Sequence, residues 1–203
     1  IIGLSDVLQA LGRRPTLTKL GLPGCHLGRD EARLLRMALC NNIPNLQSLG
    51  LAGSDLGSAG LAELAPALYQ NTSIKALDIS ENILLDMESA GLLRDILRRN
   101  KAITTLDFTG LCFGQTTGAV DYIVEGLGSN SSLMKINLSH CDLGDGGVST
   151  LARNLGSRNT TLQKLSLKDN YITSTGVGVL LETMEHSNHI TDLELERNPI
   201  GDK

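Results

Sequence analysis

One block of sequence, Leu-x-x-Leu-x-Leu with Ile or Phe as occasional substitutes, recurs seven times along this chain of 203 residues. Successive blocks start 29, 28, 29, 30, 29 and 28 residues apart. So steady a period predicts a solenoid, in which each repeat packs mainly against its neighbours. We therefore expect one continuous domain over residues 1–203, with no linker. The blocks start at Leu17, Leu46, Ile74, Ile103, Leu133, Leu162 and Ile190.

The second repeat shows what each period contains. Residues 46–51 alternate apolar with small or polar side chains, which is typical of a half-buried strand. Residues 52–57 are rich in turn formers, and Leu61, Leu64 and Leu68 then share one helical face. Pro66 is expected to kink this helix or to delay its start, because proline disrupts a helix interior. Each repeat is therefore expected to run strand, loop, helix.

An asparagine stands at the end of the helical half in nearly every repeat. Asparagine tolerates the left-handed backbone conformation that ends many helices. We therefore expect this column to stop each helix and turn the chain back into the sheet. Its members are Asn42, Asn71, Asn100, Asn130, Asn159 and Asn188.

Parallel strands and helices stacked in this order favour a curved sheet. Helices need about 10 Å of width and strands about 4.8 Å, so the strands should lie on the concave side. The pattern Leu-x-x-Leu-x-Leu-x-x-Asn/Cys-x-Leu, clearest over residues 133–148, resembles the ribonuclease-inhibitor-type leucine-rich repeat. The resemblance covers essentially the whole chain. It implies an α/β horseshoe-shaped solenoid, with a parallel sheet on the concave side and helices on the convex side.

The resemblance also makes the asparagine-or-cysteine position of each repeat informative. It implies that the cysteines at this position, Cys25 and Cys141, point inward and are buried. Leu111 departs from the pattern in repeat four, which also has the longest period. We expect a local irregularity there, on the loop edge. The position is occupied in turn by Cys25, Ser54, Asn82, Leu111, Cys141, Asn170 and Asn198.

The two ends of the chain fall within repeats. Residues 1–16 are expected to be the helical half of a preceding repeat, because Leu4, Leu8 and Leu11 form a helical apolar stripe. Neither end has the polar character of a solenoid cap. We therefore expect the chain to be a piece of a longer protein.

Bulk composition favours an intracellular protein that binds neither membranes nor nucleic acids. No apolar run approaches the roughly 18 residues that span a bilayer, and a net charge of −4 argues against non-specific nucleic-acid binding. The four cysteines form no disulfide framework, which fits a reducing compartment such as the cytoplasm. Glycosylation sequons are interpreted as coincidence, because three of the four reuse the helix-ending asparagine; they begin at Asn71, Asn130, Asn137 and Asn159.

The sequence contains no recognisable catalytic or metal-binding pattern. Cys25-His26 and His140-Cys141 occupy equivalent positions four strands apart, about 19 Å, too far for one metal ion. His186 and His189 have only Glu185 and Asp192 near them in sequence, too few for a closed site. Residues 144–147 are glycine-rich but lack the Gly-Lys-Ser/Thr of a phosphate-binding loop, so Asp145 is expected to mark a helix start. We expect no cofactor, no metal and no enzyme activity.

The strand residues between the Leu positions should face the concave side. Along the stack these residues change from small, through acidic, to basic and again acidic. We expect a protein partner to bind here, with modest affinity because the strands carry no Trp, Tyr or Arg. The alternative is that neighbouring Lys and Glu side chains only pair across strands. The candidate residues are Asp78, Asp107, Lys135, Asn137, His140, Lys164, Lys168, Asp192, Glu194 and Glu196.

The favoured function is a protein–protein interaction scaffold. Families that the resemblance brings in include ribonuclease inhibitors, sensor ends of nucleotide-binding innate-immune receptors, Ran GTPase-activating proteins and bacterial effectors. A GTPase-activating or innate-immune-receptor-type regulatory domain is therefore one alternative, although no GTPase-activating residues can be placed in this chain. A structural spacer inside a larger protein is the other alternative, since this fold hosts many roles.

Overall fold

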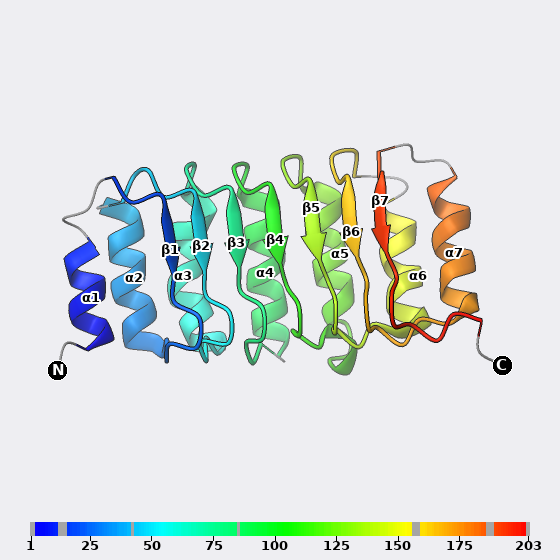
Figure 1. Ribbon diagram of the computed structural model, residues 1–203, viewed down its shortest axis with the longest axis horizontal. Coiled ribbons are helices and arrows are strands. Elements are labelled where there is room, and N and C mark those ends of the chain that lie inside the picture. The colour runs from blue at the N-terminus through cyan, green and yellow to red at the C-terminus, as the bar shows by residue number, and fades with distance from the viewer. Residues whose placement is uncertain are drawn as a thin grey trace.

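The computed structural model describes residues 3–11, 16–41, 43–84, 86–155, 159–185 and 189–201. Strands and helices alternate along it (Figure 1). The helices are α1 (Leu4–Leu11), α2 (Arg29–Asn41), α3 (Ser58–Gln70), α4 (Met87–Arg99), α5 (Ala119–Ser129), α6 (Gly144–Leu155) and α7 (Ser174–Met184), with a 3-10 turn η1 (Phe113–Gln115). The strands are β1 (Lys19–Gly21), β2 (Ser48–Gly50), β3 (Ala76–Asp78), β4 (Thr105–Asp107), β5 (Lys135–Asn137), β6 (Lys164–Ser166) and β7 (Asp192–Glu194).

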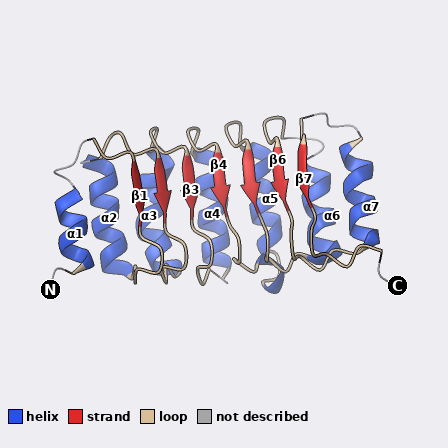
Figure 2. Cartoon of the chain, in the orientation of Figure 1, coloured by secondary structure: helices blue, strands red, loops and turns tan. Residues whose placement is uncertain are grey.

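All seven strands form one parallel sheet in sequence order, β1 to β7. Equivalent residues of successive repeats pair directly, as in Ser48 with Ala76 and Gly50 with Asp78. The helices cover one face of the sheet and leave the other open (Figure 2). The row of helices is wider than the row of strands (Figure 1), as expected when the strands lie on the inside of a bend. The expected α/β leucine-rich-repeat solenoid is confirmed.

The core lies between the sheet and the helices and is built in layers of aliphatic side chains. In the second repeat Leu49 and Leu51 from the strand region meet Leu61 and Leu64 from α3, and all four are fully buried. Burying each such side chain contributes roughly 1.5–3 kcal/mol to folding. Layers of this kind fill the core with very few aromatic rings, which explains how the fold forms without tryptophan.

The helix-ending asparagines do not adopt the expected left-handed conformation. The backbones of Asn71, Asn100 and Asn130 are extended, because the helix stop is made by the side-chain amide instead of by an unusual φ angle. Asn42 and Asn188 lie outside the described residues. The observed φ and ψ angles are −68° and 130° for Asn71, −73° and 130° for Asn100, and −84° and 136° for Asn130.

Asn100 illustrates how the side chain ends the helix. Its Oδ1 accepts hydrogen bonds from the backbone N–H groups of Ala102 and Ile103, both at 2.8 Å. Its Nδ2 donates to the carbonyl oxygen of Leu68 in the preceding repeat at 2.6 Å. Asn130 and Asn159 repeat the arrangement. These three asparagines therefore turn the chain and also join their repeats to the ones before them.

A second series of side-chain hydrogen bonds is made at the asparagine-or-cysteine position, which follows each strand instead of preceding it. Asn82 Oδ1 accepts from the N–H groups of Ser54 and Leu56, while its Nδ2 donates to the carbonyl of Leu51. Cys141 is fully buried, as expected. Cys25 is only partly buried, so that expectation is wrong; it lies next to β1, which has a neighbouring strand on one side only.

Repeat four is irregular in the expected place. Leu111 is buried where the other repeats have Cys, Ser or Asn, and η1 follows it. Cys112, which precedes η1, has a left-handed φ of 44°. Gly114 sits so close to Asp142 of the next repeat that a Cβ atom on it would overlap the Asp142 carbonyl oxygen. With Leu111, repeat four loses the side-chain hydrogen bonds that asparagine makes at this position and gains a buried apolar side chain.

Helix α3 contains Pro66 but begins at Ser58, so the expected late start is wrong. Pro66 is exposed on the outer side of the helix, where a distorted turn can face solvent. None of the helices within the described residues combines the length and apolar character needed to cross a lipid bilayer.

Candidate functional site

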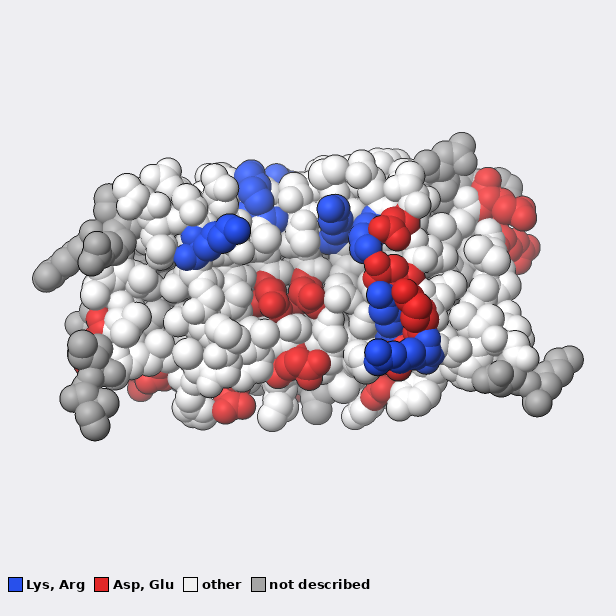
Figure 3. Space-filling model, in the orientation of Figure 1, with Lys and Arg blue, Asp and Glu red and all other residues white. Residues whose placement is uncertain are grey.

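The open face of the sheet, turned away from the helices, is called the concave face below. Because equivalent residues are in register, side chains one strand apart on this face form continuous rows. Acidic groups gather near its middle, and acidic and basic groups are mixed toward β6 and β7 (Figure 3). The expected row of charges is therefore a real surface feature of the sheet.

The charges on β6 and β7 are paired with one another. Lys164 Nζ lies 2.9 Å from Asp192 Oδ2 and also contacts Glu194 Oε1. Lys168 Nζ lies 3.0 Å from Glu194 Oε2 and 3.3 Å from Glu196 Oε1. We call these five residues the paired cluster. For them, the alternative of cross-strand pairing describes the structure well.

The pairing changes the acidity of the cluster. Hydrogen bonds from Lys164 and then Lys168 lower the pKa of Glu194 to about 2. Hydrogen bonds to Glu194 in turn raise the pKa of both lysines. Exposed pairs of this kind contribute little stability, because solvent and salt screen them. The cluster therefore has few unsatisfied charges to offer a partner.

Asp78 and Asp107 behave differently. Oδ1 of Asp78 accepts from the backbone N–H (3.0 Å) and the hydroxyl (2.6 Å) of Ser80, and Asp107 does the same with Thr109. Within the described part of the chain, neither carboxylate forms an ion pair. Both are half-buried at the end of their strands. Two unneutralised charges thus lie side by side in the centre of the concave face.

Asn137 occupies the equivalent position on β5 and makes the same turn. Its Oδ1 accepts from the N–H (3.1 Å) and hydroxyl (2.6 Å) of Ser139, and its Nδ2 donates to Asp107 Oδ2 at 3.2 Å. Lys135, at the other end of β5, is exposed and has no ion pair among the described residues. Three candidate charges therefore remain available: Asp78, Asp107 and Lys135.

A hollow of about 150 Å³ lies between these groups and the paired cluster. It is lined by residues of β4, β5, β6 and β7. Much of its surface is apolar, because the side-chain stems line it. The residues around it are Thr105, Leu106, Asp107, Lys135, Ile136, Asn137, Lys164, Ser166 and Glu194.

His140 lies in the loop after β5 and not on a strand. Its backbone N–H donates to the carbonyl of Lys168, which places it beside the basic residues as expected. Its ring, however, faces Asp169, with Nε2 3.2 Å from Oδ2, and Arg197 also contacts Asp169 at 3.4 Å. Asp169 was not among the expected site residues. The sequence could have indicated it, because Asp169 lies one repeat after His140 and so beside it in the stack.

The next question is whether the described Cys, His, Asp and Glu side chains are placed for metal binding or nucleophilic chemistry. No group of three or more His, Cys, Asp and Glu side chains there could hold a metal ion. Burial raises the pKa of the Cys141 thiol to about 12, so it stays protonated. His186 lies outside the described residues. His189 is partly buried, and its Nε2 has no hydrogen-bond partner among the described groups.

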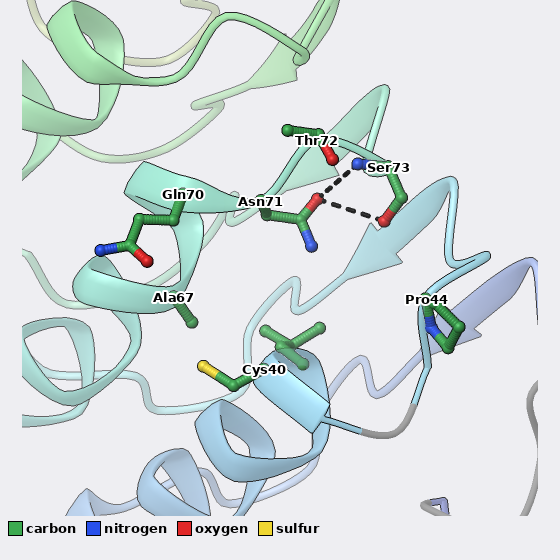
Figure 4. Close-up of a pocket in the computed structure, with 8 residues that line it drawn as sticks. Cys40, Pro44, Ala67, Gln70, Asn71, Thr72 and Ser73 are labelled. Carbon is green, nitrogen blue, oxygen red and sulfur yellow. Dashed lines mark hydrogen bonds between the residues drawn. The ribbon is translucent and has the colours of Figure 1, made fainter.

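A second hollow, of about 300 Å³, lies between the ends of α2 and α3 (Figure 4). Asn71 Oδ1 accepts from the N–H (3.0 Å) and hydroxyl (3.3 Å) of Ser73 at its edge. Cys40 contributes an exposed thiol. Apart from Cys40, the residues that line it offer only amide, hydroxyl and apolar groups, so it contains no acid–base pair.

Two of the sequon asparagines, Asn130 and Asn159, use their side-chain nitrogens in buried hydrogen bonds. Nδ2 of Asn130 donates to the Leu97 carbonyl at 2.7 Å, and Nδ2 of Asn159 donates to the Leu127 carbonyl at 2.8 Å. Both side chains are buried. A glycan on either nitrogen would break these bonds, which agrees with interpreting the sequons as part of the repeat.

Comparison with known proteins places the repeats in a family. The leucine-rich-repeat family model matches residues 129–152, 158–181 and 186–203. Human NACHT, LRR and PYD domains-containing protein 13 is 35% identical over 162 residues, covering 80% of this chain and 15% of that protein. Human NACHT, LRR and PYD domains-containing protein 12 is 32% identical, covering 97% of this chain and 18% of that protein. Pig ribonuclease inhibitor is 25% identical over 97% of this chain and 43% of its own length.

Solved structures agree on the fold. A leucine-rich-repeat protein of Legionella pneumophila, LegL7, has a TM-score of 0.69 at 23% identity, covering 97% of this chain and 62% of that one. The actin-binding site 2 fragment of leiomodin-1 has a TM-score of 0.61 at 21% identity, covering 74% and 88%. The chain spans only 15% to 18% of the length of the first curated relatives it matches. Repeat pattern, sheet topology and relatives together show that this chain belongs to the leucine-rich-repeat family of the ribonuclease-inhibitor type.

Proposed function

We propose that this chain is a protein-recognition domain that binds a protein partner through the concave face, and that it acts by binding and not by catalysis. One observation carries the proposal. Asp78, Asp107 and Lys135 project from a continuous seven-stranded sheet without ion pairs among the described residues, and Asp107 and Lys135 line a hollow. Charged groups on a rigid support, left unneutralised, favour a partner of complementary charge.

The relatives support a recognition role. Ribonuclease inhibitor is named for acting on another protein, a ribonuclease. The cysteines at positions 25, 40, 112 and 141 are all free thiols, which supports a site of action inside the cell. Binding to membranes or nucleic acids is not part of this proposal.

A second candidate is a sensor or regulatory domain within a larger receptor. It is favoured by the two human relatives above 30% identity, whose names join an LRR region to NACHT and PYD domains. In that case the same concave face would receive a ligand protein or another part of the receptor. Both candidate functions use the concave face for binding. They differ in whether binding then regulates a larger receptor.

Site-specific photo-crosslinking tests the proposal. Benzoylphenylalanine replaces Thr105, exposed on β4, or Asp121, exposed on the outer helix α5, and each protein is irradiated in cell extract. We expect protein adducts from position 105 that are absent at position 121, and binding of the identified partner once both proteins are purified. Adducts from position 121 alone would contradict the proposal. Adducts from neither position would favour a structural spacer.

A further inference from the structure

Asp78 and Asp107 are directly paired across β3 and β4. Side chains at such positions are about 4.8 Å apart, and like charges there are unfavourable. Asn137 donates one hydrogen bond to Asp107 Oδ2 at 3.2 Å, but it carries no charge. Oδ2 of Asp78 accepts no hydrogen bond from the described residues. The fold thus holds two carboxylates together, and no lysine or arginine in the described part of the chain pairs with them.

The turn after each strand does not need a carboxylate. Asn137 shows this within the same molecule, because its amide oxygen accepts the same two hydrogen bonds, from the N–H and hydroxyl of the residue two positions on. An asparagine at position 78 or 107 would therefore close the same turn. What the two aspartates add to the structure is negative charge on the concave face.

The surface beside the pair is open on the side of β1 and β2. Gly21 and Gly50 continue the same row and carry no side chain. Packing does not impose this choice, since a Cβ on Gly50 would lie 3.8 Å from the nearest atom, the Gly21 Cα. A partner segment can therefore approach the sheet closely there and reach the carboxylates from the side.

We propose that Asp78 and Asp107 together bind one arginine side chain of the partner protein, carried by a segment that lies over Gly21 and Gly50. This deepens the proposed function and depends on it. A guanidinium group fits because its planar fork of N–H donors can span two neighbouring carboxylates, whereas a lysine ammonium is a point charge. Beyond the pair, Lys135 on the neighbouring strand β5 donates to an acidic group of the same partner, so the partner presents a base and an acid close together.

The test uses a displayed library of random twelve-residue peptides, selected on the wild-type chain. We expect the enriched peptides to carry arginine, and their affinity to fall at least tenfold for the Asp78→Asn, Asp107→Asn double variant. Asp121→Asn on α5, a matched loss of one carboxylate, should change the affinity less than twofold. Within a peptide, Arg→Lys should weaken binding and Arg→Gln should abolish it. The double variant should unfold at or above the wild-type temperature, which excludes misfolding as the cause.

A third variant separates this inference from the proposed function. Gly50→Phe places a large side chain on the open part of the concave face, where a Cβ fits. Peptides blocked by Gly50→Phe but indifferent to the double aspartate variant would overturn the arginine site and leave concave binding standing. Peptides indifferent to both variants would overturn both, and so would a selection that enriches no peptide.

Discussion

A buried side-chain amide after each of the helices α4, α5 and α6 links neighbouring repeats. Asn100 satisfies two backbone N–H groups of its own turn and one carbonyl of the preceding repeat. Its side chain is only 2% exposed, so water cannot replace these bonds. At the scale of the residue, the repeat is therefore held together by polar groups as well as by leucines.

Asn100→Ala should lower the free energy of unfolding by about 2–4 kcal/mol, because it leaves buried N–H and C=O groups unpaired. The neighbouring variant Lys101→Ala, on an exposed side chain, should change it by less than about 0.5 kcal/mol. Urea unfolding followed by circular dichroism measures both. Equal midpoints for the two variants would show that the ladder is not stabilising.

The four thiols should differ widely in reactivity. Cys40 is exposed, while burial raises the pKa of Cys141 to about 12. The thiolate fraction of Cys141 at about pH 8 is then roughly a thousandfold below that of an ordinary cysteine. Iodoacetamide labelling followed by peptide mass spectrometry should modify Cys40 first and Cys141 only after unfolding. Early modification of Cys141 in the native protein would be inconsistent with its placement in the core.

At the scale of the element, η1 is the main departure from the repeat. It follows the buried Leu111, and Gly114 N–H donates to the Cys141 carbonyl at 3.0 Å. Close approach of the two backbones is what requires glycine at position 114. Phe113 also turns inward against Phe108, with ring centroids 5.8 Å apart and planes at 66°. An insertion in one repeat is thus packed firmly against its neighbours.

Gly114→Ala should destabilise the chain by about 2 kcal/mol or more, because the new methyl group collides with the Asp142 carbonyl. Gly91→Ala is the matched control: it lies inside α4, and a Cβ there meets nothing within 4 Å. That change should stabilise the chain by about 0.5–1 kcal/mol, since alanine favours helix. Thermal unfolding of both variants compares them, and a stable Gly114→Ala protein would contradict the tight packing of η1.

The sequence predicts most of this architecture, because the period alone sets strand register and the apolar positions set the buried face. It also places the irregular fourth repeat, through Leu111. The conformation of the helix-ending asparagines is mispredicted, because residue preference alone does not distinguish a left-handed backbone from a side-chain cap. Among the candidate charges, the sequence locates the rows but not the ion pairs that form within and between them. Lys164 and Lys168 pair with carboxylates of the last repeat, whereas Lys135 lies between Thr105 and Lys164, neither of which is acidic.

At the scale of the whole molecule, ion pairs are unevenly distributed along the concave face. Near β7 the charged side chains of the paired cluster neutralise one another, whereas Asp78 and Asp107 in the middle form no ion pair with the described residues. Because the pKa of Glu194 is lowered from 4.5 to about 2, its contribution to stability is present above about pH 4.5. It is lost as the pH falls through about 2, where the folded protein takes up the proton.

Glu194→Gln tests this contribution. The variant should melt about 1–3 °C below wild type near pH 7, since exposed pairs are individually weak. The difference should shrink as the pH is lowered from about 4.5 and vanish once the pH is below about 2. Melting temperatures across this range measure it. A difference that is constant with pH would mean that the lysine hydrogen bonds do not stabilise the folded carboxylate.

Carboxyl-group footprinting tests the central claim, recognition through the concave face, most directly. The chain, alone and with the partner identified by crosslinking, is treated with carbodiimide and glycine ethyl ester, and each carboxylate is quantified by mass spectrometry. We predict that the partner suppresses labelling of Asp78 and Asp107 at least threefold. Labelling of Glu88 and Asp121, exposed on α4 and α5, should stay unchanged. Protection of Glu88 and Asp121, with Asp78 and Asp107 labelled as before, would contradict the account.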